Sequence, residues 1–244
     1  MKWSDKAIIL SARRLGENSG IIHILTENHG MYKGVDKGAF GKSKRGIYQT
    51  GNIVAAHWHA RLSEQLGMLS CEIEQATAAR IIDDKCKLAV ISSAAGLIEK
   101  ILPEREPQNT IFDDMSTLVA ALCGDGDYLK EYVRLEFNLL ACSGFGIDVE
   151  RCAATGQTHD LSYVSPKSGR AVSKNAGIPY KDKLLILPDF LYNTSDEPDK
   201  VNTHEILAGI KLCGHFLAER VFAHARGVPP SRARLTQILE NTIS

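Results

Sequence analysis

Hydrophobic residues follow two different periods along the chain, and the change falls near residue 76. Before it, short apolar runs alternate with turn-forming residues such as Glu27-Asn28-His29-Gly30. Runs of this kind, bounded by Gly and Asn, predict β-strands, and several of them at regular spacing indicate a small barrel. The expected strands cover residues 6–12, 20–26, 31–36, 52–59 and 62–74.

Beyond residue 76 the apolar residues recur at helical spacing. The expected helices cover 75–102, 110–123 and 128–142, another from Thr203 to Val221, and a last one after Pro229-Pro230 with Ser231 as its N-cap. Residues 147–190 instead carry turn signals, among them Thr155-Gly156 and Ser168-Gly169. The pattern therefore predicts an α+β protein with a barrel domain at 1–76 and a helical domain at 77–244. Residues 147–190 form a turn-rich insert in that helical domain.

The segment from Gly30 to Gly46 carries the most distinctive chemistry. Five glycines lie among four lysines and one arginine, Asp36 is the only acid, and the aromatic residues Tyr32 and Phe40 are interleaved. Glycine allows a backbone to bend sharply, and a loop with cations and rings suits a polyanion whose bases stack. This segment makes the oligonucleotide-binding (OB) barrel the natural candidate. The alternative is a solvated basic hairpin without a ligand.

Two more specific sites, a phosphate-binding P-loop and a histidine metal site, are not supported by the sequence of the same domain. Gly41-Lys42-Ser43 matches the end of a phosphate-binding P-loop, but Asp36 stands where the first glycine belongs and would face the phosphates. His57 and His59 lie on one face of a predicted strand, yet no third metal ligand is near them in sequence. We interpret the strand as half exposed, with Trp58 in the core.

Charge and cysteine usage narrow the class of protein. The formal net charge is zero, but residues 1–61 hold ten Lys and Arg against four acids, so they carry +6 and the remainder carries −6. Such asymmetry indicates a polyanion-binding part joined to an acidic part. The six cysteines are scattered without a C-x-x-C pair, which favours a reducing cytoplasm. We recognise no signal peptide and no membrane span.

The order of motifs resembles the bacterial RecO family over essentially the whole chain. The barrel part contributes Arg13-Arg14 with Gly16-Glu17-Asn18-Ser19, Thr26-Glu27 before Gly30, and Lys37-Gly38-Ala39 followed by Lys42-Ser43-Lys44-Arg45. The helical part contributes Arg134-Leu135-Glu136, Gly144-Phe145-Gly146, Cys152-Ala153 before Thr155-Gly156, and Tyr163 before Ser165-Pro166-Lys167 and Gly169. Each motif alone is weak, and their order along one chain is specific.

The resemblance implies a non-enzymatic mediator of DNA repair and homologous recombination. RecO-like proteins bind single- and double-stranded DNA, anneal complementary strands and engage the single-strand-binding protein SSB. With RecR they load RecA onto SSB-coated gaps, which places the protein in the cytoplasm, at the nucleoid. Annealing of arbitrary strands requires DNA contacts that do not depend on the base sequence. The expected DNA-binding residues are Arg13, Lys33, Lys37, Lys42, Lys44 and Arg45 at phosphates, with Tyr32 or Phe40 stacking a base.

Two further expectations follow from the resemblance. Arg134 and Arg232 fall where the family places the cationic rim of a pocket for the acidic SSB tail, although each could equally be a surface ion pair. The family's insert often holds zinc between two C-x-x-C pairs. The corresponding positions here are Cys152, Thr155, Ser173 and Ala176, so three thiolates are absent and we expect neither zinc nor another cofactor.

Two other classes of protein remain open. A protein-interaction scaffold with a basic handle would show the same charge pattern. A cysteine- or metal-dependent hydrolase would need a pair such as Cys152 with His159, but the sequence shows no carboxylate pair and no H-x-x-x-H or G-x-S-x-G motif. Salt-dependent DNA binding would distinguish the mediator from the scaffold.

Overall fold

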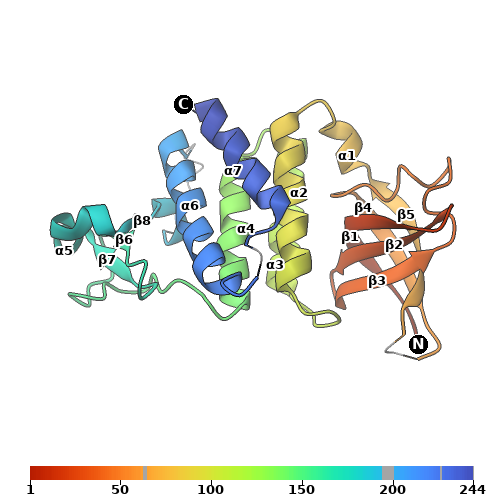
Figure 1. Cartoon of the computed structure of the whole chain (residues 1–244), viewed down its shortest axis with the longest axis horizontal. Helices are drawn as coiled ribbons and strands as arrows, with labels where there is room; N and C mark the ends of the chain where they lie inside the picture. Colours follow the sequence, from red (N-terminus) through yellow and green to blue (C-terminus); the bar gives the residue numbers. More distant parts are fainter. Residues whose placement is uncertain (63–64, 194–200, 226, 244) are drawn as a thin grey trace. The chain divides into compact units, whose positions relative to one another are not determined.

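The computed structural model describes residues 1–62, 65–193, 201–225 and 227–243 (Figure 1). The chain divides into two compact units, Met1–Gly126 and Asp127–Ser244. The strands of the first unit end at Gln75 and its helices begin at Thr77, where the hydrophobic period changes. The first three helices nevertheless belong to the compact unit of the barrel. The domain boundary predicted at residue 76 therefore separates strands from helices, whereas the two compact units divide later in the chain, after Gly126.

The first unit begins with a closed five-stranded barrel, as the sequence predicts. Its strands follow the order β1-β2-β3-β5-β4, and all neighbours are antiparallel except β3 and β5. This is a mixed α+β fold with an N-terminal barrel of the expected class. The strands are β1 (Lys2–Leu15), β2 (Ser19–Thr26), β3 (Gly30–Asp36), β4 (Ile53–His59) and β5 (Gly67–Gln75).

Two local features close the barrel. A register shift between Ile9 and Ser11 bends β1, so that one half pairs with β4 and the other with β2. At the β3–β5 contact, a Cβ on Gly67 would lie 2.3 Å from the Trp58 ring, so only glycine fits there. Trp58 itself is buried in the barrel core, as expected.

Three helices complete the first unit: α1 (Thr77–Arg80), α2 (Lys85–Ile101) and α3 (Asn109–Cys123). The single helix predicted over 75–102 is wrong, because the chain breaks between α1 and α2. The Asp84 carboxylate accepts hydrogen bonds from the backbone N–H groups of Cys86 and Lys87, which makes it the N-cap of a new helix. Helix α2 contacts β1, so its one acidic side chain, Glu99, can reach the barrel.

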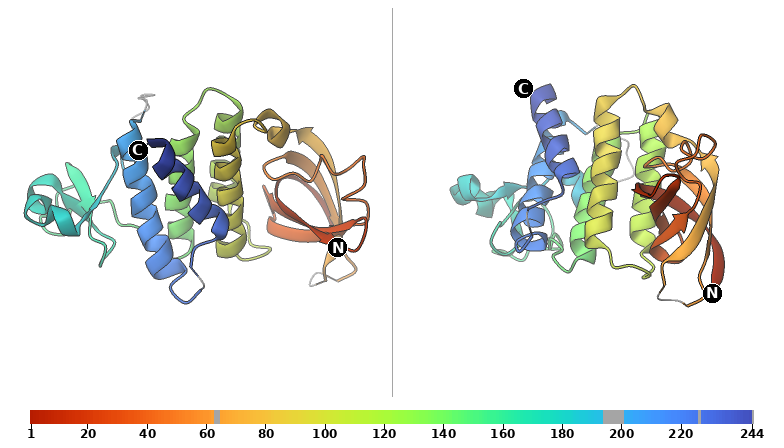
Figure 2. Two further views of the ribbon diagram at one scale, coloured as in Figure 1. Left: turned by 45° about the horizontal axis from the view of Figure 1, so that its top comes forward. Right: turned by 45° about the vertical axis from the view of Figure 1, so that its right-hand side comes forward.

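The second unit is built on α4 (Tyr128–Cys142), α6 (Thr203–Phe216) and α7 (Pro230–Ile243), which lie side by side (Figure 2). A π-helical segment, η3 (Leu217–Val221), continues α6. Helix α7 begins at Pro230, so the predicted N-cap Ser231 lies inside the first turn. Proline suits a first helical position, because its φ is already helical and that position needs no N–H partner.

The insert of the second unit holds a small sheet of order β7-β6-β8. It also contains helical turns that the turn signals did not predict. Its elements are β6 (Leu161–Val164), β7 (Ala171–Ser173), α5 (Lys174–Gly177), η1 (Ile178–Lys183), β8 (Leu185–Ile186) and η2 (Asp189–Leu191). Throughout the described residues, every helix is too short or too polar to cross a bilayer.

Candidate nucleic-acid interface

The connection between β3 and β4, residues 37–52, is a run of hydrogen-bonded turns rather than a loose loop. Backbone bonds run from Gly41 N to Gly38 O at 3.0 Å and from Lys44 N to Gly41 O at 3.1 Å. Ala39 and Tyr48 are buried in the barrel core, which anchors the connection at two points. The cations of this segment are therefore carried by an ordered surface.

Asp36 organises these turns from inside. Its carboxylate accepts hydrogen bonds from Gly38 N at 2.7 Å, from Lys44 Nζ at 2.8 Å, and from the Tyr48 hydroxyl. Burial alone would raise the pKa of Asp36, but these hydrogen bonds outweigh it and hold the pKa below its usual value. The only acid of the basic segment thus points inward and is neutralised by Lys44.

The exposed cations gather beside the turn between β1 and β2. Lys37, Lys42 and Arg45 are exposed and have no ion pair among the described residues. The Arg14 guanidinium lies 4.8 Å from the centre of the half-buried Phe40 ring, and Phe40 N donates to Asn18 O. We call Arg14, Lys37, Phe40, Lys42 and Arg45 the basic surface of the barrel.

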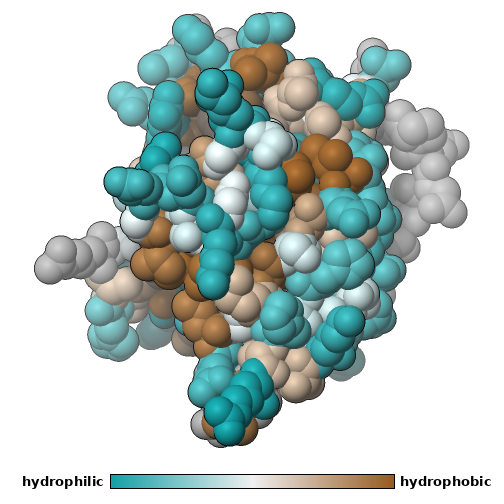
Figure 3. Space-filling model, turned by 90° about the vertical axis from the view of Figure 1, so that its right-hand side faces the viewer, coloured by the Kyte–Doolittle hydropathy of each residue, from teal (hydrophilic) through white to brown (hydrophobic). Residues whose placement is uncertain are grey.

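The barrel side of the molecule is mostly hydrophilic, with hydrophobic residues in separate patches (Figure 3). Scattered apolar residues on a surface need no partner of their own, whereas unpaired cations beside a ring suit a nucleic-acid strand. The barrel therefore offers charge and a stacking edge rather than an extended apolar docking face.

The structure corrects one of the expected DNA-binding residues, Tyr32, and gives two others, Arg13 and Lys33, acidic partners. Tyr32 is 6% exposed, and its ring packs edge-on against Trp3 and Trp58, so it cannot stack on a base. Arg13 pairs with Glu99 at 3.2 Å, and Lys33 pairs with Glu104 at 2.6 Å.

Arg14, which the sequence reasoning did not select, is the arginine that lies over the Phe40 ring. Neighbouring residues on a strand face opposite ways, so only one member of Arg13-Arg14 can lie beside Phe40. Both arginines are exposed, and the sequence does not say which of them lies over Phe40 and which pairs with Glu99.

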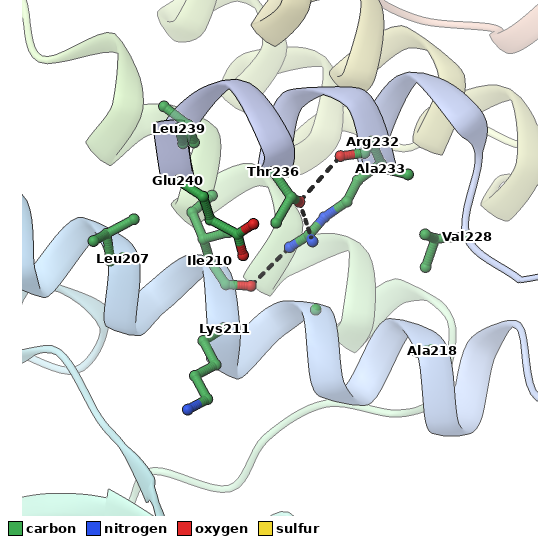
Figure 4. Close-up of a pocket in the computed structure, with 11 residues that line it drawn as sticks. Leu207, Ile210, Lys211, Ala218, Val228, Arg232, Ala233, Thr236, Leu239 and Glu240 are labelled. Carbon is green, nitrogen blue, oxygen red and sulfur yellow. Dashed lines mark hydrogen bonds between the residues drawn. The ribbon is translucent and has the colours of Figure 1, made fainter. Parts of the chain in front are cut away.

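The second unit contains an apolar pocket of about 640 Å³ between α6 and α7 (Figure 4). Its lining residues are Leu207, Ile210, Lys211, Gly214, Ala218, Val228, Arg232, Ala233, Thr236, Leu239 and Glu240. In the close-up, Arg232 reaches from α7 towards the Ile210 carbonyl, and the Lys211 amine is directed away from it. The pocket is thus apolar, and its lining contains two cations, Arg232 and Lys211, and one acid, Glu240.

Arg232 is also a structural residue. It is 6% exposed and binds the fully buried Glu136 of α4 through Nε at 2.9 Å and NH2 at 3.2 Å. Its other bonds go to Ile210 O and Thr236 Oγ1, so four of its five N–H donors have partners. Tyr132 donates to the same carboxylate at 2.5 Å.

Arg134 does not share this pocket. Its guanidinium contacts Phe190 O at 3.4 Å and Glu131 at 3.6 Å, and it is absent from the pocket lining. The expected common rim of Arg134 and Arg232 is therefore not formed. The second cation beside Arg232 is Lys211, which only the packing of α6 on α7 identifies.

The insert places Thr155 and Ser173, two of the expected zinc positions, against Cys152 without forming a zinc donor set. Ser173 N donates to Cys152 Sγ at 3.2 Å. Burial raises the pKa of the Cys152 thiol, but hydrogen bonds from Ser173 and Thr155 outweigh burial and lower the pKa to about 6. One sulfur with hydroxyl groups and Ala176 does not fit zinc, which needs four charged or imidazole donors in such sites. Among the described residues, no three His, Cys, Asp or Glu side chains form a candidate metal site.

Comparison with known proteins matches both parts of the chain. Family models described as "Recombination protein O N terminal" and "Recombination protein O C terminal" match residues 1–76 and 83–227. The DNA repair protein RecO of Rhodospirillum centenum is 46% identical over 96% of this chain and 93% of its own length. The RecO proteins of Rhodospirillum rubrum and Bartonella quintana are 40% and 41% identical, each over 98% of this chain and over 96% and 98% of their own lengths.

Proposed function

The chain belongs to the RecO family of DNA repair proteins, and we propose that it binds and anneals DNA during homologous recombination through the basic surface of its barrel, without catalysing a covalent step. The observation that carries this proposal is the set of exposed cations Lys37, Lys42 and Arg45, which have no ion pair in the described part of the chain and share the β3–β4 connection with Phe40, the ring under Arg14. Cations of this kind attract phosphates irrespective of sequence, and a partly exposed ring can stack on a base. Single- and double-stranded DNA are both ligands of such a surface.

Replacing Lys37, Lys42 and Arg45 together by alanine is expected to weaken DNA binding and to reduce its dependence on salt. Each lost phosphate contact lowers the slope of log K against log salt by about 0.7 for a single strand, so the slope should fall by about 2. Fluorescence anisotropy of a labelled oligonucleotide in a sodium chloride series measures this slope. Lys44 is left intact, because it holds Asp36.

The matched control removes three exposed lysines elsewhere in the first unit, Lys2, Lys85 and Lys100. This variant loses the same charge but should keep the wild-type slope. Annealing of complementary oligonucleotides is then followed with EDTA present, because we propose that no zinc is needed. If the wild-type protein neither binds nor anneals DNA at low salt, the hypothesis of a protein-interaction scaffold would be favoured instead.

We also propose that the pocket between α6 and α7 binds the acidic C-terminal tail of SSB. Such a tail ends in an apolar residue with a free carboxylate, and needs an apolar pocket with cations at its edge. Leu207, Val228 and Leu239 supply apolar lining, while Lys211 and the remaining NH1 donor of Arg232 supply positive charge. The cooperation with RecR and the loading of RecA on SSB-coated strands belong to the same proposal.

Ala233→Trp is expected to abolish most binding of the SSB tail, because the larger side chain fills the pocket. A labelled peptide with the sequence of the tail, titrated with protein, measures the affinity, and a loss of about tenfold or more is expected. The control is Asn241→Trp on α7, an exposed position outside the pocket lining. Equal affinities for the two variants would place the tail elsewhere on the protein.

A further inference from the structure

A second group of cations and an aromatic ring lies on the insert, far along the chain from the basic surface of the barrel. The segment Lys174–Lys183 forms α5 and η1 and contains three lysines and one acid, Asp182. Tyr180 is 61% exposed and Ile178 is 53% exposed, which makes them two of the most exposed large apolar residues in the described chain. Lys174, Lys181 and Lys183 are exposed as well.

Helical geometry arranges these side chains in two rows. Lys174 and Ile178 are four residues apart, which places them on one face of an α-helical turn. In the 3₁₀ segment that follows, residues three apart eclipse one another, so Lys181 continues the row of Ile178 and Lys183 lies over Tyr180. Each row therefore combines an apolar or aromatic side chain with at least one cation.

The segment is held firmly against the small sheet. Gly177 is buried, and a Cβ at this position would lie 2.3 Å from the ring of Tyr163 on β6. The backbone that carries the two rows therefore approaches the sheet as closely as it can. Side chains that project from a fixed backbone lose less freedom when they bind a ligand.

The lysines of this segment also have no acidic partner in the part of the chain that the structure describes. Among the described residues, Lys174, Lys181 and Lys183 form no ion pair, in contrast to Arg13, Lys33 and Lys44 in the barrel. Unpaired cations next to an exposed ring match the chemistry of a single nucleic-acid strand, with phosphates at the cations and a base on the ring.

We propose that Lys174, Tyr180, Lys181 and Lys183 form a second contact for single-stranded DNA and that this contact contributes to annealing. The proposal rests on the proposed function, since annealing brings two strands together and a second contact lets one protein hold both. The basic surface of the barrel holds one strand. The insert surface holds another strand, or another part of the same one, by charge and stacking that carry no sequence code.

Lysine acetylation in the presence and absence of an unlabelled thymidine oligonucleotide tests the contact directly. Lys174, Lys181 and Lys183 are expected to be protected about threefold or more, and the exposed Lys85 should react equally in both samples. Lys37 and Lys42 report independently on the basic surface of the barrel.

Substitutions then test the role in annealing. Lys174→Ala, Lys181→Ala and Lys183→Ala combined, or Tyr180→Ala alone, should each slow annealing about fivefold or more, while Tyr180→Phe keeps the ring and should stay near the wild-type rate. Unprotected insert lysines, or wild-type annealing rates in these variants, would overturn the inference while Lys37 and Lys42 remain protected. If wild-type protein binds no DNA, the proposed function itself fails.

Discussion

Arg232→Ala should lower the free energy of unfolding by about 3–5 kcal/mol, because it leaves the carboxylate of Glu136 buried without its cation. The two residues join α7 to α4, and Arg232 also binds the Ile210 carbonyl of α6. Burial would lower the pKa of Arg232, but the Glu136 carboxylate outweighs it and raises the pKa, so the arginine stays charged. Urea denaturation at pH 7 measures the loss.

Two further variants separate the ion pair from the packing of α7. Arg234→Ala on the same helix removes an exposed arginine and should change stability by less than about 0.5 kcal/mol. Glu136→Leu combined with Arg232→Met removes both charges, and it should be less destabilised than Arg232→Ala, since no charge is left buried alone. If the double variant is the less stable protein, the hydrogen bonds of the Glu136 carboxylate stabilise the helices by more than an uncompensated buried charge costs.

This network also explains why the sequence identified Arg232 but assigned it an incomplete role. Its position in the family pattern marks it as important, but nothing in the local sequence shows that Glu136, 96 residues away, lies against it. A residue expected at an exposed rim is therefore mainly a link between three helices. Lys211, the exposed cation of the pocket, has no motif at all, and only the packing of α6 on α7 reveals it.

The barrel was easier to predict because its signals are local. Alternating apolar residues and glycine-rich turns determine each strand, and the strands at 20–26, 31–36 and 52–59 agree with β2, β3 and β4 within about one residue. The helix at 75–102 was wrong because helical spacing of apolar residues continues through Asp83-Asp84, whereas the Asp84 side chain starts a new helix there. The N-cap at Asp84 therefore decided where the helix begins, and the spacing of apolar residues over 75–102 did not.

The DNA-binding residues were likewise only partly predictable from the sequence. The sequence shows that Arg13 and residues 33–45 are basic, but it does not show that Glu99 on α2 and Glu104 after it pair with Arg13 and Lys33. Burial decides between the two rings in the same way, because Tyr32 points into the core and Phe40 outward to Arg14. The chemistry of the ligand can be predicted from composition, and the contacting residues only from the fold.

Asp36→Asn should destabilise the barrel by about 1–3 kcal/mol at pH 7 and weaken DNA binding, because the turns that carry Lys37 and Lys42 lose their internal anchor. An amide cannot accept the same charged bond from Lys44 or hold the buried Tyr48 hydroxyl as strongly. Asp125→Asn, an exposed carboxylate outside the barrel, is the matched control and should change neither quantity.

The pH dependence of this difference identifies the charge of Asp36 as the cause. A carboxyl group whose pKa is lower in the folded protein stabilises it fully above the unfolded pKa, near 3.8, and loses that effect as the pH falls through the folded value. The gap in stability between wild type and Asp36→Asn, measured by urea denaturation, should therefore be constant from pH 7 to pH 5 and shrink below about pH 4. A gap that persists unchanged at pH 3 would mean that the shape of the hydrogen-bonded turn, and not the ionised carboxylate, holds the basic surface in place.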